Sequence, residues 1–204
     1  MNIEIMKLNE FIFAYDFVGS VVLLEGKRDV NENDKEKLIA LGKLLCLKTK
    51  EIIFRSGNAE GADYYFAKGV TEVNKNRMEV ITPYSKHRKK YNDASITYSL
   101  DDIDIAAEPE VVYESKQNKK TEKLIDKYVL GARDPFSLKA AYIIRDTIKV
   151  LGTEKIKPAT FGIFYDDLNN PMQGGTGHTM NVCIKHKIPL INQEIWLKWL
   201  EKEN

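Results

Sequence analysis

Short apolar runs alternate along this chain with longer segments in which apolar residues recur every three or four positions. The runs, which read as buried strands, cover 18–26, 51–57, 77–83, 159–167 and 188–191. Parallel neighbouring strands need crossover connections of about the length that separates these runs. The alternation therefore predicts an α/β fold: a doubly wound, mainly parallel sheet with helices on both faces.

Helices are expected in the segments between the runs. Leu38, Leu41 and Leu45 follow an Asn-rich start that can cap a helix, and a later helix would turn Met180 and Cys183 inward. Helices are predicted within 31–50, 58–70 and 136–150, in the segment after the last glycine loop, and within 193–204.

Composition excludes several classes of protein. Lys and Arg number 31 and Asp and Glu 30, so the chain lacks the strong positive field of a protein built to hold duplex nucleic acid. Nucleic acid is therefore the less favoured partner. No stretch has the length of a membrane span, and the N-terminus resembles no signal peptide. Cys46 and Cys183 are far apart and are expected to be reduced core thiols, so we expect a cytoplasmic protein without a membrane partner.

The alternation breaks between about 84 and 135. The acidic stretch SLDDIDIAAEPE is followed there by the lysine-rich ESKQNKKTEKLIDK. Charge blocks that separate by sign are typical of solvated segments. We expect 1–204 to form a single domain in which about 99–134 is an insertion or a mobile lid.

Two glycine-rich turns run from a predicted strand directly into a predicted helix. Such turns place unpaired N–H groups at the positive end of a helix dipole, where an anion is stabilised. Tight turn geometry alone also explains single glycines, but two such turns at one sheet edge favour phosphate binding. The candidate residues are Ser56, Gly57, Gly61, Gly174, Gly175, Thr176, Gly177 and Thr179. Neither turn matches the GxxxxGK[ST] or the GxGxxG pattern.

Four strand ends together resemble the SLOG superfamily, a Rossmann-like group that includes DprA/Smf proteins, LOG phosphoribohydrolases and nucleotide sensors of bacterial and phage conflict systems. GKRD resembles that family's GSRD, SGNAEGAD its SGGAxGAD, and GGTGHT its GGxGT, while TPY ends the third strand. The resemblance covers most of 18–98 and 158–192. It implies a Rossmann-like domain whose glycine turn at 174–179 holds the phosphate of a nucleotide-like molecule.

The same resemblance bears on catalysis. The hydrolase branch of the family follows GGxGT with a glutamate, where this chain has Met180 and Asn181. Asp166 and Asp167 end the fourth strand beside the glycine loop and are the remaining candidates to assist cleavage of an N-glycosidic bond if the protein is an enzyme. A pair of solvated capping acids is the alternative, and whether the protein is an enzyme stays open.

Other strand-end residues add candidates for ligand contact. Arg28 can form a bidentate pair with phosphate and Asp29 can accept from ribose hydroxyls, although a surface ion pair between the two is an equal alternative. Pro83 belongs to the third strand end, and His178 has a positioning role in the glycine loop. The three histidines lack metal spacing with one another, so we expect no metal and no cofactor.

These features favour a binding protein or sensor for a nucleotide-derived small molecule. The alternatives are a nucleoside 5′-monophosphate N-glycosidase and a DprA-like protein that binds single-stranded DNA through lysines at 86–90 and 116–127. Proteins with similar domains commonly pair, and 136–150 is a candidate interface for a homodimer or higher oligomer.

Overall fold

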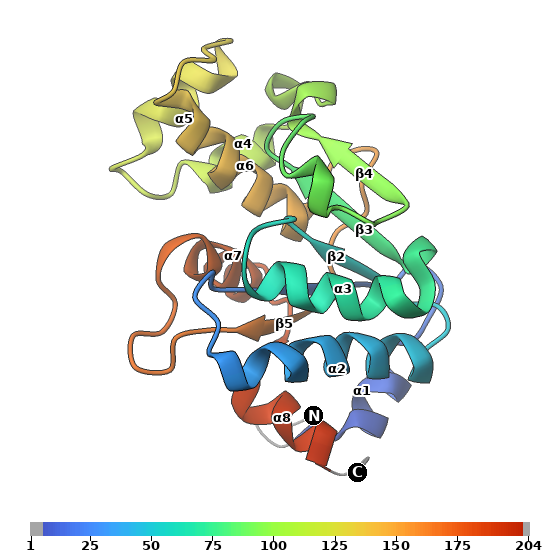
Figure 1. Ribbon diagram of the computed structural model, residues 1–204. Coiled ribbons are helices and arrows are strands. Elements are labelled where there is room, and N and C mark those ends of the chain that lie inside the picture. The colour runs from blue at the N-terminus through green and yellow to red at the C-terminus, as the bar shows by residue number, and fades with distance from the viewer. Residues whose placement is uncertain (1–5, 202–204) are drawn as a thin grey trace.

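The computed structural model describes residues 6–201, which form a three-layer α/β fold around one sheet (Figure 1). The six strands of the described part of the chain are β1 (Val21–Gly26), β2 (Ile53–Ser56), β3 (Met78–Thr82), β4 (Ile96–Ser99), β5 (Phe161–Tyr165) and β6 (Leu190–Ile191). Their order in the sheet is β4-β3-β2-β1-β5-β6, and every pairing is parallel. The predicted Rossmann-like fold class is confirmed, and each of the five predicted strands is present.

Helices follow most of the strands, as the periodicity predicts. The α-helices are α1 (Leu8–Tyr15), α2 (Glu32–Lys48), α3 (Ala62–Asn74), α4 (Pro109–Ser115), α5 (Glu122–Val129), α6 (Ser137–Leu151), α7 (Gly174–Lys185) and α8 (Gln193–Glu201). The shorter 3-10 turns are η2 (Lys75–Arg77), η3 (Lys89–Tyr91), η4 (Leu100–Asp102) and η5 (Ile105–Ala107). Helix α1 lies in a segment for which the sequence predicted only an N-terminal arm.

The two faces of the sheet bury different sets of helices (Figure 1). Side chains alternate along a strand, so Val22 and Leu24 of β1 pack in one core cluster while Leu23 packs in another. The first cluster includes buried residues of α1, α2, α3 and α8, and the second includes residues of α6 and α7. Burial on both faces explains why the central strands read as continuous apolar runs.

The strand order reverses at β1. Strand β1 lies between β2 and β5, and Gly26 is in register with Tyr165 at the carboxyl end of the pair. The chain leaves β1 toward α2 on one face and leaves β5 toward α7 on the other face. Connections that diverge in this way open a crevice at the carboxyl edge, where doubly wound proteins bind ligands.

The segment 99–134 is packed more closely than its charge suggests. It carries the end of β4 together with α4 and α5, and these helices contact α6. A third core cluster buries its apolar residues against α6: Leu100, Ile105, Val111, Ile125 and Tyr128. The segment therefore supplies part of the core, and its movement as a lid stays a prediction.

The cysteines match the prediction from composition. Cys46 and Cys183 are unpaired and buried, and burial raises the pKa of both thiols. None of the helices within residues 6–201 combines the length and the apolar character needed to cross a bilayer.

Candidate functional site

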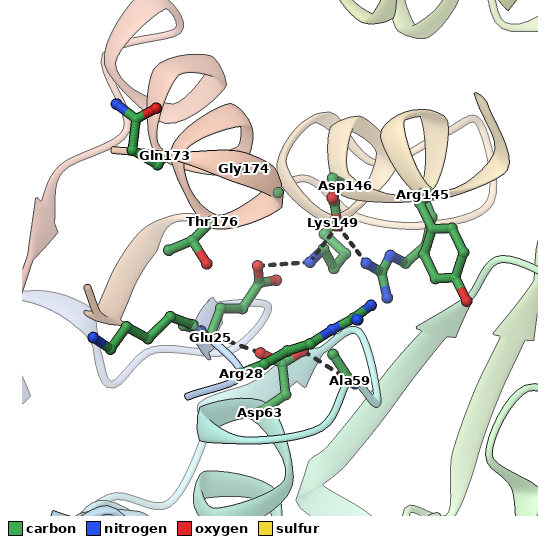
Figure 2. Close-up of a pocket in the computed structure, with 14 residues that line it drawn as sticks. Glu25, Arg28, Ala59, Asp63, Arg145, Asp146, Lys149, Gln173, Gly174 and Thr176 are labelled. Carbon is green, nitrogen blue, oxygen red and sulfur yellow. Dashed lines mark hydrogen bonds and ion pairs between the residues drawn. The ribbon is translucent and has the colours of Figure 1, made fainter. Parts of the chain in front are cut away.

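A cavity of about 360 Å³ opens at the carboxyl edge of the sheet, beside the point where the strand order reverses (Figure 2). Its walls come from the end of β1 and the loop after it, the start of α3, one side of α6 and the first turn of α7. The lining residues are Glu25, Gly26, Lys27, Arg28, Ala59, Asp63, Tyr142, Arg145, Asp146, Lys149, Gln173, Gly174, Gly175 and Thr176.

The first turn of α7 offers free backbone donors to this cavity. Gln173 precedes the helix in an extended conformation, and Gly174 has a φ of 63°, a value that favours glycine. Within the described chain, the N–H groups of Gly174, Gly175 and Thr176 have no hydrogen-bond partner. Free amides at the positive end of a helix form a site for an anion.

Arg28 adds a positive charge next to these amides. Its side chain makes no hydrogen bond or ion pair with any residue in the range 6–201, and Figure 2 shows it extending across the cavity toward Arg145. Lys27 also lines the cavity and is 3.5 Å from Asp167, with both side chains partly exposed. Arg28 therefore adds an uncompensated positive charge to the exposed part of the cavity, whereas the charge of Lys27 is paired with Asp167.

The floor of the cavity consists of a buried network of charges. Lys149 Nζ lies 2.6 Å from Glu25 Oε2 and 2.8 Å from Asp146 Oδ1. Arg145 Nη2 lies 2.8 Å from the same Asp146 oxygen, and Arg145 Nη1 donates to the carbonyl of Gly57 at 2.7 Å. Charges with this little solvent are tolerated only when they are paired, so the network fixes the positions of its members.

Glu25 is the acid whose ionisation costs most in this network. Burial raises its pKa, attraction to Lys149 lowers it, and repulsion from Asp63 and Asp146 raises it again, which leaves the pKa at about 7. Asp146 behaves differently: burial favours its neutral form, but Arg145 and Lys149 outweigh burial and lower its pKa. Glu25 Oε1 is buried and has no hydrogen-bond partner in the part of the chain that the structure describes. This oxygen can accept a hydrogen bond from a ligand.

In the glycine-rich turn after β2, backbone N–H groups already form hydrogen bonds within the protein. Asp63 accepts hydrogen bonds from the N–H groups of Gly26, Gly57 and Ala59 at 3.1, 3.0 and 3.4 Å. Ser56 Oγ accepts from the next amide of the turn at 3.1 Å. The expectation that both turns offer free amides therefore needs revision, because Asp63 occupies those of the turn after β2.

Gly61 allows the start of α3 to pack closely against the loop after β1. Its φ is 84°, and a Cβ there would overlap the backbone of Arg28. The amide of Ala62 donates to the carbonyl of Lys27 at 3.1 Å. Gly61 thus holds the start of α3 under the loop that carries Arg28, and it does not line the cavity itself.

Other predicted site residues lie outside this cavity. The carboxylate of Asp166 accepts the N–H of Met172 at 2.8 Å, and Asp167 caps the turn at Asn169. His178 Nε2 is 2.9 Å from Thr147 Oγ1 on α6. Asp29 is exposed, and Pro83 lines a different cavity. Gly177 packs against the carbonyl of Met172. The hydroxyl of Thr179 donates to the carbonyl of Gly175.

The sequence reasoning missed the buried charges of the cavity. Glu25 is the only acid in the run VVLLEG, and an acid in a strand buried on both faces is a signal of function. Arg145, Asp146 and Lys149 likewise interrupt the apolar pattern of α6 on one side of the helix. No group of three or more His, Cys, Asp or Glu residues in 6–201 is placed to hold a metal ion.

Fold and cavity together define a Rossmann-like α/β protein with a charged cavity at the carboxyl edge of its sheet. No protein-family model and no curated protein matches the sequence. Solved structures with a similar chain arrangement include DNA processing protein A from Helicobacter pylori, a single-stranded DNA binding protein, at 14% identity and a TM-score of 0.46. The match covers 86% of this chain and 65% of that one.

Two further structures are similar to the same degree. The molybdenum cofactor carrier protein of Chlamydomonas reinhardtii has 15% identity and a TM-score of 0.46, with 85% of this chain and 75% of that one covered. DprA from Streptococcus pneumoniae has 12% identity and a TM-score of 0.45 over 90% of this chain and 52% of its own. The chain thus spans about half to two thirds of the two DprA chains. At these identities the similarity is limited to the general arrangement of the chain, and membership of the SLOG superfamily stays a prediction.

Proposed function

We propose that this protein binds a phosphorylated, nucleotide-like small molecule in the cavity beside β1. The observation that carries the proposal is the convergence of free donors on one space: the amides of Gly174, Gly175 and Thr176 and the guanidinium of Arg28. Amides at a helix start and an unpaired arginine are the groups that bind phosphate in proteins. The cavity volume falls in the range of small-molecule sites.

The rest of the cavity suits the sugar of such a ligand. Within residues 6–201, Glu25 Oε1 is a buried acceptor without a hydrogen-bond partner, and Glu25 lines the same cavity as the free amides. A ribose hydroxyl is a donor that would satisfy it, since a buried acceptor left unpaired costs free energy. We propose that the phosphate of the ligand lies at the start of α7 and that its sugar lies toward β1.

Calorimetric titration with ribose 5-phosphate, and with inorganic phosphate as a smaller probe, tests the proposal. We expect Arg28→Gln to weaken ribose 5-phosphate binding by at least about 10-fold, because a charge-assisted hydrogen bond is lost. Lys90→Gln removes an exposed charge outside the cavity and serves as the matched control. Equal affinities in the wild type and in Arg28→Gln would contradict the proposed site.

Salt dependence separates this function from binding of single-stranded DNA. An oligonucleotide that contacts many phosphates releases many counterions, so its affinity falls steeply as salt rises. A ligand with a single phosphate responds weakly to salt. An affinity for a short oligonucleotide that exceeds that for ribose 5-phosphate and falls steeply with salt would favour the nucleic-acid alternative.

The position of Glu25 supports one second candidate, hydrolysis of an N-glycosidic bond. Asp166 and Asp167 do not line the cavity, whereas Glu25 does and has a pKa of about 7. In such a reaction the carboxylate takes a proton from water as the water oxygen bonds to the anomeric carbon, the bond from that carbon to the base breaks, and the base leaves with the bonding electrons and receives the same proton from the Glu25 carboxyl group through solvent. Release of free base from a nucleoside monophosphate, lost in Glu25→Gln and kept in Asp167→Asn, would establish this activity.

A further inference from the structure

A second cavity, of about 390 Å³, lies beside the N-terminal half of α6. It is bounded by the residues after β3, the turn after β4, the segment between α5 and α6, and the start of α6. The two cavities share no lining residue. The ring of His87 contacts Tyr84 of the second cavity at 5.2 Å and Tyr142 of the first at 5.6 Å, and so separates the two spaces. A molecule in the second cavity is therefore a different ligand from the one at the start of α7.

Apolar and aromatic side chains form most of the wall of the second cavity. They are Pro83, Tyr84, Tyr128, Pro135, Leu138 and Ala141. A space of this volume and lining can enclose the apolar part of a small molecule. Leu138 is 40% exposed there, so contact with an apolar ligand would remove its side chain from water.

The hydroxyl of Tyr128 is a polar group of the wall that lacks a partner. Tyr128 is only 3% exposed, and within residues 6–201 its hydroxyl forms no hydrogen bond. Unlike Glu25 Oε1, its oxygen keeps contact with solvent. Because the hydroxyl of a buried tyrosine usually has a hydrogen-bond partner, a polar ligand in the cavity is a suitable one.

Arg133 holds a positive charge next to Tyr128. Its guanidinium lies over the Tyr128 ring, 4.0 Å from the centroid. Nη1 donates to the carbonyls of Tyr128 and Ala132, at 2.9 Å in both cases. The other two nitrogens of the guanidinium form no hydrogen bond in the described part of the chain. The group is thus fixed by the protein, and two nitrogens remain to donate to a carboxylate.

Asp101 holds a negative charge in the same wall. Its Oδ2 accepts from the N–H and the hydroxyl of Ser85 at 2.9 and 2.8 Å, and its Oδ1 has no partner among residues 6–201. Burial raises the pKa of Tyr128, Arg133 lowers it and Asp101 raises it, so both charges act on the same hydroxyl. Arg133 and Asp101 nevertheless form no ion pair with each other in this range. The other acid of the wall, Asp134, caps the start of α6.

We propose that the second cavity binds a zwitterionic α-amino acid with a large apolar side chain. The carboxylate accepts from Arg133, the ammonium group donates to Asp101, and the side chain lies against Pro83 and Leu138. The two separated protein charges and the apolar wall each have a counterpart in such a ligand, whereas a ligand with one charge would leave the other protein charge unpaired. The site is independent of the anion site proposed for the first cavity.

Calorimetric titration with L-phenylalanine and two analogues tests the class of ligand. The analogue 3-phenylpropionate lacks the ammonium group, and 2-phenylethylamine lacks the carboxylate. We expect saturable binding of L-phenylalanine and affinities at least about 10-fold lower for both analogues, because each loses one charge-assisted hydrogen bond. Absence of L-phenylalanine binding, or equal affinity for either analogue, would overturn the proposal.

Two exposed substitutions test the position of the site. Arg133→Gln should weaken L-phenylalanine binding at least about 10-fold and leave 2-phenylethylamine binding unchanged, whereas Asp101→Asn should weaken L-phenylalanine binding and leave 3-phenylpropionate binding unchanged. The controls are Lys139→Gln and Asp102→Asn, at exposed residues outside this cavity, and they should have no effect.

Ribose 5-phosphate binding should be the same in Arg133→Gln as in the wild type, which distinguishes this site from the first cavity. L-phenylalanine binding that both Arg133→Gln and Asp101→Asn leave unchanged would place the ligand elsewhere and overturn the proposal.

Discussion

The ammonium group of Lys149 lies 2.6 Å from the carboxylate of Glu25, and both side chains are almost entirely buried. The two residues are 124 positions apart in sequence, and the pair joins α6 to the central strand β1. Asp146 shares the same ammonium group, so the positive charge of Lys149 is divided between two acids. Glu25 is therefore incompletely compensated, and its second oxygen is buried without a hydrogen-bond partner among the described residues.

This incomplete compensation predicts a pH dependence of stability. The pKa of Glu25 rises from 4.5 to about 7 in the folded protein, so between these values the native state keeps a proton that the unfolded chain has lost. Stability then falls as pH rises through this window, in total by a few kcal/mol at about 1.4 kcal/mol per pH unit. Chemical denaturation of the wild type and of Glu25→Gln at pH 5, 6, 7 and 8 measures the effect.

The comparison with Glu25→Gln isolates this residue, because the other titrating groups are present in both proteins. The wild type should lose stability relative to the variant from pH 5 to pH 7 and run parallel to it above pH 8. Parallel profiles from pH 5 to pH 7 would show that Glu25 is ionised throughout and that Lys149 compensates it fully.

Gly61 and Gly131 form a matched pair of substitutions. Both have positive φ, 84° and 99°, but a Cβ at Gly61 would overlap the backbone of Arg28, whereas a Cβ at Gly131 meets open space. Alanine at Gly131 should cost about 1 kcal/mol through the backbone alone. Alanine at Gly61 should cost about 3 kcal/mol, because the clash adds to the strain. Equal losses in thermal or chemical denaturation would mean that the loop after β1 yields freely.

Gly175 provides a test of the anion site that spares the fold. It is exposed in the first turn of α7, and the nearest atom to an added Cβ is an Asp146 oxygen at 3.1 Å. Valine should weaken ribose 5-phosphate binding by at least about 10-fold while changing the free energy of unfolding by only about 1 kcal/mol. Alanine, which adds only the Cβ, should have a smaller effect on binding. Undiminished affinity in the valine variant would argue against phosphate at this turn.

Asp63 organises the loops on the other side of the cavity. Its carboxylate accepts three backbone N–H groups, from Gly26, Gly57 and Ala59. In Asp63→Asn the amide NH2 must face at least one of these donors, so we expect a loss of about 2 to 3 kcal/mol in the free energy of unfolding. Asp29→Asn, at an exposed acid near the same cavity, is the control and should change stability little.

The central strands could be predicted from sequence because burial on both faces leaves a continuous apolar run. Strand β4 could not, since Ile96–Ser99 is an edge strand of four residues in which Thr97 is exposed. Helices α4 and α5 could not be predicted from the sequence for a similar reason. Their few buried residues, such as Val111 and Ile125, are scattered among charges, and only their contact with α6 reveals them.

The sequence likewise predicted only some residues of the candidate site. The turn at 174–176 and Arg28 are local features of a strand end, and the sequence placed them correctly at the sheet edge. Glu25, Arg145 and Lys149 become a site only when β1 and α6 meet, and a single sequence carries no signal of that meeting. The Gly57 amide was expected to be free because the competing acceptor, Asp63, is not visible as such until α3 is placed.

The central claim is that an anion binds to the free amides of α7. The most direct measurement is a titration of 15N-labelled protein with ribose 5-phosphate, followed by the amide NMR resonances of Gly174, Gly175 and Thr176. The account predicts that these three resonances shift most and with a single saturating dissociation constant, while the amide of Gly57, which is bound to Asp63, shifts little. Saturable binding that leaves the three resonances in place and shifts a distant set instead would contradict the account.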